Sequence, residues 1–319
     1  MEKTTLDPSK TYKVLPHFEP RIWGGSRMLE RYGYETDVYP VGEVYNVVAL
    51  PGAADCVVEG TGMTLSALYE AEPSWFDCDT TQLPVRVNIL DPLADLSVQL
   101  HPNDEYAQAH DNSRGKPECW VILDAPEDGK IEYGHNARTR EEFVQMAEAG
   151  DWGHLLKYLP AKKDWFIDLP AGTLHAIGRD VLTYNVSRNA DLTYRLFDYD
   201  RVDPTTGTHR DLHIDKVIDC VNVPDETVGF VWFDPRREGD LEVTDYWDEP
   251  GLYTVSRVRC EGQGTYAHDR FMFYTVVEGA GLVNDVPVKR GETVLVPAGV
   301  GELRLAGVLD GFVASYRNA

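Results

Sequence analysis

Cysteine is scarce in this chain of 319 residues and follows no pattern. The five cysteines are scattered, odd in number and without a Cys-x-x-Cys pair: Cys56, Cys78, Cys119, Cys220 and Cys260. This distribution argues against a disulfide framework and against a thiolate zinc cluster. We expect reduced thiols that mostly behave as small, buried apolar side chains.

Positive charge is also in short supply. Lysine and arginine together number 30 against 53 aspartates and glutamates, which gives a net charge of −23. Such a chain is a poor partner for nucleic acid or for an anionic membrane surface. Its overall field also repels an anionic substrate, although salt screens that field beyond roughly 8–10 Å. A phosphate-bearing substrate would therefore need a local basic pocket.

Long apolar runs are missing as well. No stretch approaches the ~18 residues of a membrane span, and the N-terminal segment lacks the basic-then-apolar layout of a signal peptide. We therefore expect a cytoplasmic protein. The hydrophobic content of 43% is that of a globular chain with an ample core, and the length suggests about two domains of ~150 residues each.

Short β-strands dominate what is present. Segments rich in Val, Ile, Leu, Tyr and Trp, bounded by Gly, Pro, Asp or Asn, recur along the chain, as in "VYNVVAL", "LPVRVNIL", "CWVILDA" and "LTYNVS". Helical spacing follows a capping threonine in residues 64–76 and, more strongly, in residues 139–159. The pattern predicts a β-rich core with a small helical insertion at about residues 104–160.

The C-terminal part has a different texture. A polar, turn-rich stretch near residue 235 reads as a linker, and evenly spaced strands punctuated by glycine follow it. Within them, "RGETVLVPAGVGELRLAG" loosely echoes the earlier "KDWFIDLPAGTLHAIG", since both run strand, Pro-Ala-Gly turn, strand. The echo favours two related β-barrels.

One predicted strand, residues 96–101, carries an unusual polar face. Alternate side chains of a strand point to opposite faces. Here one face is wholly apolar, whereas the other presents Ser97, Gln99 and His101. An apolar face against a core is routine, so the polar row is the candidate for function.

Two further residues could join this row to form a metal site. Glu118 follows a glycine turn at the start of the next predicted strand, and His175 follows the Pro-Ala-Gly turn. Together with Gln99 and His101, these nitrogen and oxygen donors on three strands describe a catalytic zinc site or a similar divalent site. The alternative stays open, because a histidine in a β protein is more often a hydrogen-bonded packing residue and the spacing obeys no rule.

Basic residues cluster in the same part of the sequence. Lys116 lies on the glycine turn, "DLTYRLFDYDR" supplies Arg195 and Arg201, and "THRDLH" supplies Arg210. Arginine suits bidentate contact with phosphate. For Arg201 and Arg210 we favour pairing with nearby aspartates, whereas Arg195 follows a strand that should emerge close to the metal-site strands.

A resemblance joins these pieces. The segments "RIWGG", "LPVRVNILDPLADLSVQLHP", "GKPECW", "LPAGTLHAIG" and "DLTYRLFDYDR" occur in the order found in short bacterial type I mannose-6-phosphate isomerases of the cupin superfamily, and the chain resembles that family over essentially its whole length. The resemblance implies a mainly β protein of two cupin (jelly-roll) domains. Residues 1–237 would form the metal-binding domain with the helical insertion, and residues 238–319 a second, degenerate cupin domain.

The resemblance also assigns site residues. It implies the metal ligands Gln99, His101, Glu118 and His175, and the pocket residues Ser97, Lys116 and Arg195. Two histidines, one glutamate and one glutamine suit one Zn²⁺, although manganese, iron or cobalt would also be accepted. The implied reaction interconverts mannose 6-phosphate and fructose 6-phosphate.

The implied chemistry divides into three tasks. A divalent metal holds the sugar oxygens and the negative charge that develops on them. A base moves a proton between C1 and C2. A cation at the far end holds the phosphate, for which Arg195 and Lys116 are the candidates, with Ser97 as a hydroxyl partner.

The chain departs from the family at three positions. Asn88 stands where the family usually has lysine, Asn185 where it usually has a glutamate ten residues before the arginine, and Tyr45 where tryptophan is usual. Since asparagine cannot act as a general base, the base is open. One positive and one negative charge vanish together, so we hypothesise that Asn88 and Asn185 face each other on the pocket floor as an amide pair.

Three functions remain open at this stage. The first, which we favour, is a mannose-6-phosphate isomerase that uses another base, such as metal-bound hydroxide or Lys116. The second is a divergent cupin paralogue that acts on another sugar or sugar phosphate. The third is a metal-containing, sugar-binding protein without turnover. All four implied ligands are intact, which argues against outright loss of function.

Overall fold

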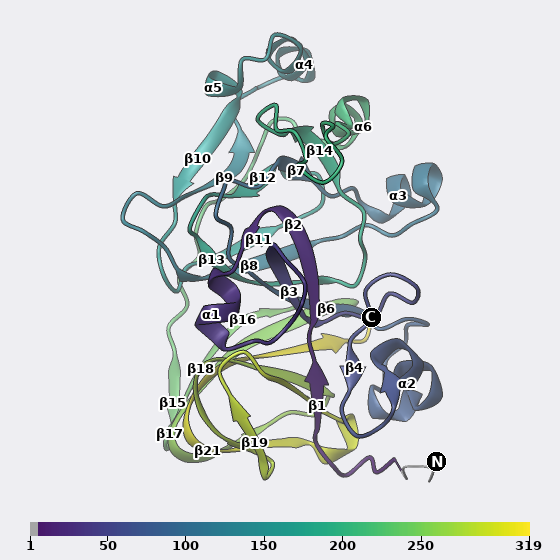
Figure 1. Cartoon of the computed structure of the whole chain (residues 1–319), viewed down its shortest axis with the longest axis vertical. Coiled ribbons are helices and arrows are strands. Elements are labelled where there is room, and N and C mark those ends of the chain that lie inside the picture. Colours follow the sequence, from purple (N-terminus) through teal and green to yellow (C-terminus); the bar gives the residue numbers. More distant parts are fainter. Residues whose placement is uncertain (1–5) are drawn as a thin grey trace.

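The computed structural model describes residues 6–319 and contains three antiparallel β-sheets stacked along its long axis (Figure 1). The middle sheet has six strands in the order β11 (Phe166–Leu169), β8 (Glu118–Asp124), β13 (Leu182–Arg188), β6 (Val85–Leu90), β3 (Val41–Val47) and β2 (His17–Gly25). The upper sheet has five, in the order β10 (Leu156–Pro160), β9 (Lys130–His135), β12 (His175–Ile177), β7 (Val98–Leu100) and β14 (Tyr194–Phe197). Side chains from both sheets meet in the space between them.

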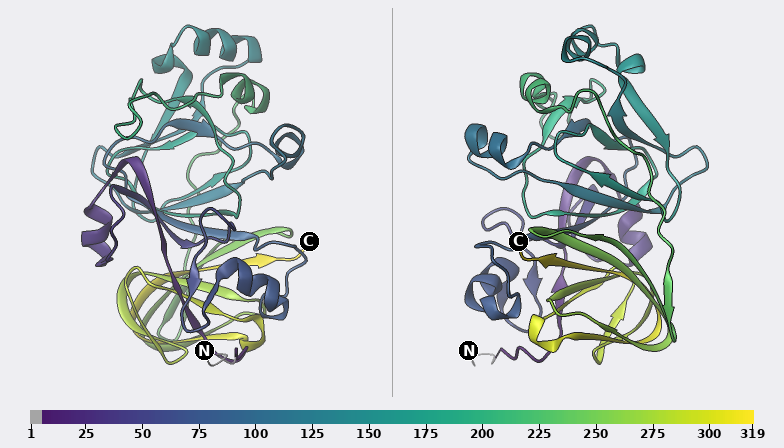
Figure 2. Two further views of the ribbon diagram at one scale, coloured as in Figure 1. Left: turned by 45° about the vertical axis from the view of Figure 1, so that its right-hand side comes forward. Right: turned by 180° about the vertical axis from the view of Figure 1, so that it is seen from behind.

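The lower sheet combines the two ends of the chain. Its path is β15 (Arg236–Glu238), β16 (Leu241–Asp248), β17 (Leu252–Ala267), β21 (Glu302–Arg317), β18 (Met272–Val283), β20 (Thr293–Val296), β1 (Tyr12–Leu15), β4 (Val57–Val58) and β5 (Met63–Thr64), with β19 (Val286–Lys289) paired to β18. Figure 2 shows the purple N-terminal strand running down beside the yellow C-terminal strands. The predicted mainly β class is confirmed, and none of the three sheets closes into a barrel.

Helices are few and short among the described residues. They are α1 (Arg27–Tyr32), α2 (Leu65–Ala71), α3 (Asp104–Asp111), α4 (Arg140–Glu148), α5 (Trp152–Leu155) and α6 (Ile214–Cys220), with 3₁₀ turns at Pro73–Trp75 and Ala298–Val300. The predicted caps are confirmed, since the side chain of Thr64 accepts from Ala67 N and that of Thr139 from Glu142 N.

The predicted helical insertion at residues 104–160 contains strands as well as helices. Helices α3, α4 and α5 lie in this range, but β8, β9 and β10 lie between them and belong to the middle and upper sheets. The reason is the apolar run "CWVIL" in β8, which is buried on both faces and pairs with strands on both sides.

Strand β6 shows how alternation places the site. It is buried throughout, and its alternate residues Val85, Val87 and Ile89 pack into an apolar core between the middle and lower sheets. The intervening Arg86 and Asn88 point to the other side, where they line a cavity beneath the upper sheet. One face of the middle sheet therefore forms the floor of the cavity, and its other face packs against the apolar core that it shares with the lower sheet.

The five cysteines are all free, as expected, and Cys56, Cys119 and Cys260 are buried. Within residues 6–319, no helix combines the length and the apolar character needed to traverse a lipid bilayer.

Candidate active site

The polar face of β7 is the centre of a row that crosses three strands of the upper sheet. His175 on β12 and Arg195 on β14 are both registered opposite Gln99 on β7. Cross-strand partners in an antiparallel sheet share a face, so the three side chains line up. Ser97 and His101 flank Gln99 on the same face. The sequence-predicted row is thus joined by residues nearly a hundred positions away.

A donor set suited to a metal forms where this row meets the middle sheet. One ligand atom from each of His101, Glu118 and His175 lies within 4.8 Å of the others, and all three residues are buried. The Nε2 atom of His101 is 3.4 Å from Oε2 of Glu118, and Nε2 of His175 is 3.6 Å from Oε1. Glu118 opens β8 of the middle sheet, so the set spans both sheets.

The backbone orients both imidazole rings toward the same point. The Nδ1 atom of His101 pairs with the carbonyl of Leu192 at 2.8 Å, and that of His175 with the carbonyl of Thr173 at 2.9 Å. This arrangement places the proton on Nδ1 and leaves Nε2 as the free donor, the usual outer-shell support of a metal-binding histidine. Nε2 of His175 is buried without a hydrogen-bond partner, and a metal ion would satisfy it.

The protonation states agree with this interpretation. Burial lowers the pKa of His175 to about 4, and burial, together with the Lys116 ammonium, lowers the pKa of His101. Burial alone would raise the pKa of Glu118, but Lys116 and the two histidines outweigh it and hold that pKa well below its usual range. Neutral imidazoles and an ionised carboxylate are the forms that bind divalent metals.

A cavity of about 410 Å³ opens beside this donor set. The residues that line it from the metal side are Ser97, Gln99, Lys116, Glu118 and Trp120, and those from the floor and rim are Arg21, Glu43, Arg86, Asn88, Asn185, Asp191, Arg195, Arg210 and His213. All of the sequence-predicted pocket residues are therefore brought to one cavity. Its volume falls within the range typical of small-molecule sites.

One end of the cavity carries an arginine without an acidic partner. Arg195 donates from Nε to Ser97 Oγ at 3.2 Å and from Nη1 to the carbonyl of Asp211 at 2.8 Å. No carboxylate in the described part of the chain lies within 4.0 Å of it. Burial, followed by the charge of Arg210, lowers the pKa of Arg195. An uncompensated guanidinium of this kind is suited to an anion.

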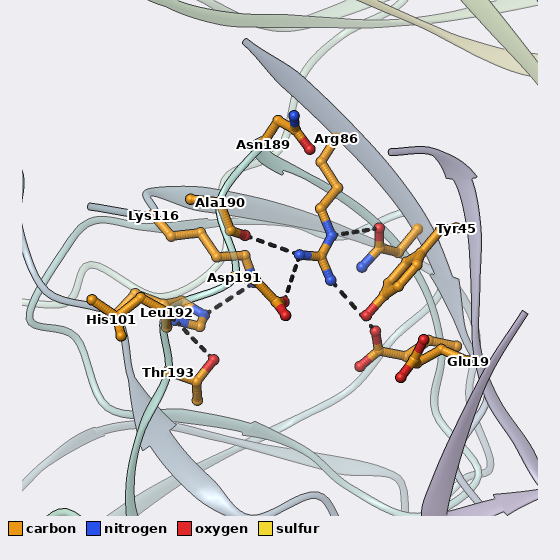
Figure 3. Close-up of polar contacts among 12 residues, drawn as sticks. Glu19, Tyr45, Arg86, His101, Lys116, Asn189, Ala190, Asp191, Leu192 and Thr193 are labelled. Carbon is orange, nitrogen blue, oxygen red and sulfur yellow. Dashed lines mark hydrogen bonds and ion pairs between the residues drawn. The ribbon is translucent and has the colours of Figure 1, made fainter. Parts of the chain in front are cut away.

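The neighbouring arginines behave as the sequence suggested. Arg210 pairs with Asp198 at 2.6 Å and Arg201 with the same carboxylate at 2.5 Å. Lys116, in contrast, extends toward the donor set. Its Nζ lies 3.4 Å from Nε2 of His101 (Figure 3), and 3.1 Å from Oε2 of Glu118. A lysine at this place can exchange protons with a bound ligand.

The two departures on the floor are neighbours, but they do not form an amide pair. Asn185 on β13 is registered directly opposite Asn88 on β6, as hypothesised. However, Nδ2 of Asn185 donates to the carbonyl of Cys119 at 3.1 Å, and Oδ1 of Asn88 accepts from Nε of Arg86 at 3.3 Å. The two residues therefore face each other as hypothesised, but no hydrogen bond joins their side chains among the described residues.

Sequence reasoning overlooked the charged residues of the floor. Arg86 is buried there and contacts Asp191, while Glu43 and Tyr45 lie on adjacent β3 (Figure 3). A signal was present, since Arg86 shares a strand face with Asn88 at a spacing of two residues in "VRVN".

These features of the site indicate a class of protein. A buried donor set of two histidines and a carboxylate, beside a small polar cavity with an unpaired arginine, on a mainly β scaffold, describes a metal-dependent protein for an anionic small molecule. No family model matches the chain, but individual proteins are similar to it in sequence and in structure.

The chain is 37% identical over 308 residues to mannose-6-phosphate isomerase ManA of Bacillus subtilis, a match that covers 94% of this chain and 96% of that protein. It is 32% identical over 307 residues to the mannose-6-phosphate isomerase of Streptococcus mutans, with 93% and 95% covered. The crystal structure of the mannose 6-phosphate isomerase from Bacillus subtilis has a TM-score of 0.90 at 31% identity, covering 95% of this chain and 99% of that one. The chain belongs to the mannose-6-phosphate isomerase family.

A more distant structure shares the fold. A zinc-bound mannose 6-phosphate isomerase matches with a TM-score of 0.78 at 14% identity, over 96% of this chain. The donor set formed by His101, Glu118 and His175 fits the same kind of ion, because nitrogen and carboxylate ligands with an open position are those of catalytic zinc.

Proposed function

We propose that this protein is a metal-dependent aldose–ketose isomerase that interconverts mannose 6-phosphate and fructose 6-phosphate. The observation that carries the proposal is the convergence of His101, Glu118 and His175 within 4.8 Å, beside a cavity that both Glu118 and the unpaired Arg195 line. Membership of the family, at 37% identity to a named mannose-6-phosphate isomerase, supports it.

In this proposal Gln99, His101, Glu118 and His175 hold one Zn²⁺. The ion would bind oxygens at the C1–C2 end of the sugar and stabilise the negative charge that develops there. Gln99 lines the cavity beside Glu118 and accepts from Ser97 Oγ at 3.2 Å, which fixes its amide oxygen. The backbone carbonyls at Leu192 and Thr173 keep the two rings oriented.

The phosphate would lie against Arg195 and Ser97. Ser97 accepts from Nε of Arg195 and donates its one proton to Gln99, so it holds the guanidinium in place while the remaining N–H groups of Arg195 donate to the phosphate. Since Arg195 is registered opposite Gln99, which in turn is opposite His175, a phosphate held at Arg195 places the other end of the sugar at the metal.

Proton transfer between C2 and C1 falls to Lys116. Only the neutral amine can take a proton, so the ammonium, which pairs with Glu118 at 3.1 Å, would first release a proton to solvent. The amine would then take the proton that leaves C2 as its C–H bond breaks and return it to C1, while the proton of the C2 hydroxyl passes to the oxygen on C1. The position of Lys116 supports this role, because its Nζ lies 3.1 Å from Glu118, at the proposed metal site. Asn88 and Asn185, which replace charged residues of the family, would contact the substrate from the floor of the cavity.

Three finer assignments belong to the same proposal. The chain would be a short bacterial type I enzyme of the cupin superfamily, with a metal-binding domain at residues 1–237 and a degenerate cupin domain at residues 238–319. A cytoplasmic location remains an expectation from the sequence pattern. A different sugar phosphate is the second candidate for the substrate, and the asparagines at positions 88 and 185 favour it, because they alter the floor that a sugar contacts.

A coupled assay for fructose 6-phosphate formation from mannose 6-phosphate tests the proposal. Zinc-loaded protein should show turnover, and a chelator-treated sample should lose it and regain it with added zinc. If a protein that demonstrably contains stoichiometric zinc shows neither turnover nor exchange of the C2 proton with solvent, the proposed reaction is wrong for this chain.

A further inference from the structure

The floor of the cavity contains an arginine that the protein holds rigidly. Arg86 is 2% exposed. Its Nε donates to Asn88 at 3.3 Å, and its Nη1 donates to the carbonyl of Ala190 and to Asp191, both at 2.9 Å. The guanidinium also stacks 4.2 Å from the ring centre of Tyr45 (Figure 3). These contacts fix the plane of the group and leave Nη2 as its free end.

A carboxylate oxygen without a partner faces this free end. Oε2 of Glu43 lies 3.7 Å from Nη2 of Arg86, which is longer than a hydrogen bond. Oε2 is buried without any hydrogen-bond partner, and Nη2 makes no hydrogen bond to the described residues. The other oxygen, Oε1, lies 3.4 Å from Nε of Arg21. A donor and an acceptor are thus left unpaired side by side.

A hydroxyl group has the chemistry that these two atoms lack, and a small movement of Glu43, which lines the cavity, would bring its buried Oε2 within reach of one. The hydroxyl accepts a hydrogen bond from the guanidinium and donates one to the carboxylate, and its oxygen can lie about 2.7–3.0 Å from both atoms across the 3.7 Å gap. An anion would suit this place less well, because Glu43 and Asp191 already balance the charge of Arg86. The unpaired Arg195 is the opposite case and suits phosphate.

We propose that Arg86 and Glu43 bind one hydroxyl of the substrate and thereby select which sugar phosphate the cavity accepts. This inference rests on the proposed function, in which the metal takes the C1–C2 end and Arg195 the phosphate on C6. In the open-chain sugar the hydroxyls on C3, C4 and C5 are then left, and we assign the floor to the one on C3 or C4, because C5 is next to the phosphate-bearing C6 at Arg195. Arg86 and Glu43 both line the cavity together with the metal ligand Glu118.

Deoxy sugars test the subsite. For the unaltered protein, kcat/KM for either 3-deoxy- or 4-deoxymannose 6-phosphate should fall about 10- to 100-fold below that for mannose 6-phosphate, because a charge-assisted pair of hydrogen bonds is lost. Arg86→Met and Glu43→Gln should each lower kcat/KM for mannose 6-phosphate by a similar factor. They should also abolish most of the discrimination against that deoxy sugar.

The design separates a contact from a structural role. Arg259→Met is the matched control, since Arg259 on the lower sheet is likewise paired with more than one carboxylate, among them Glu242 and Asp310. It should leave kcat/KM and discrimination unchanged. If the floor variants keep the full discrimination against both deoxy sugars, the subsite is wrong, whatever their activity.

Two further measurements keep the test decisive. Zinc content and the unfolding temperature establish that each variant is folded. If Arg86→Met does not fold, Glu43→Gln and the deoxy sugars with the unaltered protein decide the question. If the unaltered protein shows no turnover, the proposed function fails, and calorimetric binding of mannose 6-phosphate and its deoxy forms then tests the subsite alone.

Discussion

Two segments with similar sequences end in different chemistry. The run "LPAGTLH" connects β11 to β12 and ends at His175, which is 2% exposed and faces Glu118. The run "VPAGVGE" connects β20 to β21 and ends at Glu302, whose side chain is 41% exposed and pairs with Arg304 at 2.6 Å. One strand carries a metal-site residue and its counterpart carries a surface ion pair.

The difference shows that the scaffold does not create the site by itself. In both segments a strand, a Pro-Ala-Gly turn and a second strand form. The turns differ in detail, because Gly172 adopts a positive φ of 82°, whereas Ala298–Val300 form a 3₁₀ turn before the positive φ of 71° at Gly301. Within residues 6–319, only His101, Glu118 and His175 form a group of three or more potential ligands.

The largest expected effect on zinc binding and activity comes from replacing the histidine that ends the first of these two segments. His175→Ala should abolish stoichiometric zinc binding and reduce kcat/KM by well over about a hundredfold, since loss of a mere outer-shell partner already costs 10- to 100-fold. Glu302→Ala, at the corresponding place, should leave both unchanged. Zinc content by elemental analysis and the coupled assay measure the pair, and equal losses in the two variants would contradict the assignment.

A second experiment compares the floor of the cavity with the family pattern. Asn88→Lys alone places a second cation beside Arg86, whose Nε is 3.3 Å from the Asn88 side chain, and should lower the free energy of unfolding by about 3–5 kcal/mol. Adding Asn185→Glu on the opposite strand should recover most of that loss. Urea titration measures the three variants, and simple additivity would show that the two positions do not interact.

A smaller effect is expected at the basic end of the cavity. Arg195→Met removes the guanidinium that has no acidic partner, and should lower kcat/KM for mannose 6-phosphate about 10- to 150-fold, mainly through KM. Activity on mannose, which has no phosphate, should change little. Steady-state kinetics on both sugars provide the comparison, and an equal loss on both would assign Arg195 a structural role.

The sequence predicted much of the site because its residues follow local rules. The alternation at residues 96–101 places Ser97, Gln99 and His101 on one face, and the structure brings Glu118 and His175 to the same point. Register across strands is a long-range property, and for that reason the row from His175 to Arg195 was out of reach of periodicity alone.

The differences from these predictions have physical causes as well. Helices form within residues 104–160, but they alternate with β8, β9 and β10, whose pairing in the middle and upper sheets is a long-range property. Asn88 and Asn185 face each other, but Asn88 accepts from Arg86 and Asn185 donates to the carbonyl of Cys119. Arg86 was overlooked because a single arginine in an apolar strand carries no sequence signal of its partners. In the structure it contacts Asn88, Ala190 and Asp191 on the floor of the cavity.

The smallest predicted effect compares the two faces of β12 and β9. His175 faces the cavity, whereas Glu132, paired in register with Ala176, is buried with neither carboxylate oxygen bonded. Burial raises the pKa of Glu132 well above its usual range, with Asp225 adding to the shift. From about pH 4.3 upward, the folded protein keeps a proton that the unfolded chain releases, so the free energy of unfolding contributed by Glu132 falls as pH rises.

Glu132→Gln should remove this dependence. The variant should unfold ~2 °C higher than the unaltered protein at pH 8 and at nearly the same temperature at pH 4, where both side chains are uncharged. Glu302→Gln, at a partly exposed glutamate of the lower sheet, should leave the pH dependence unchanged. Thermal unfolding across this range measures the difference, and a stabilisation independent of pH would mean that Glu132 titrates alike in the folded and unfolded chains.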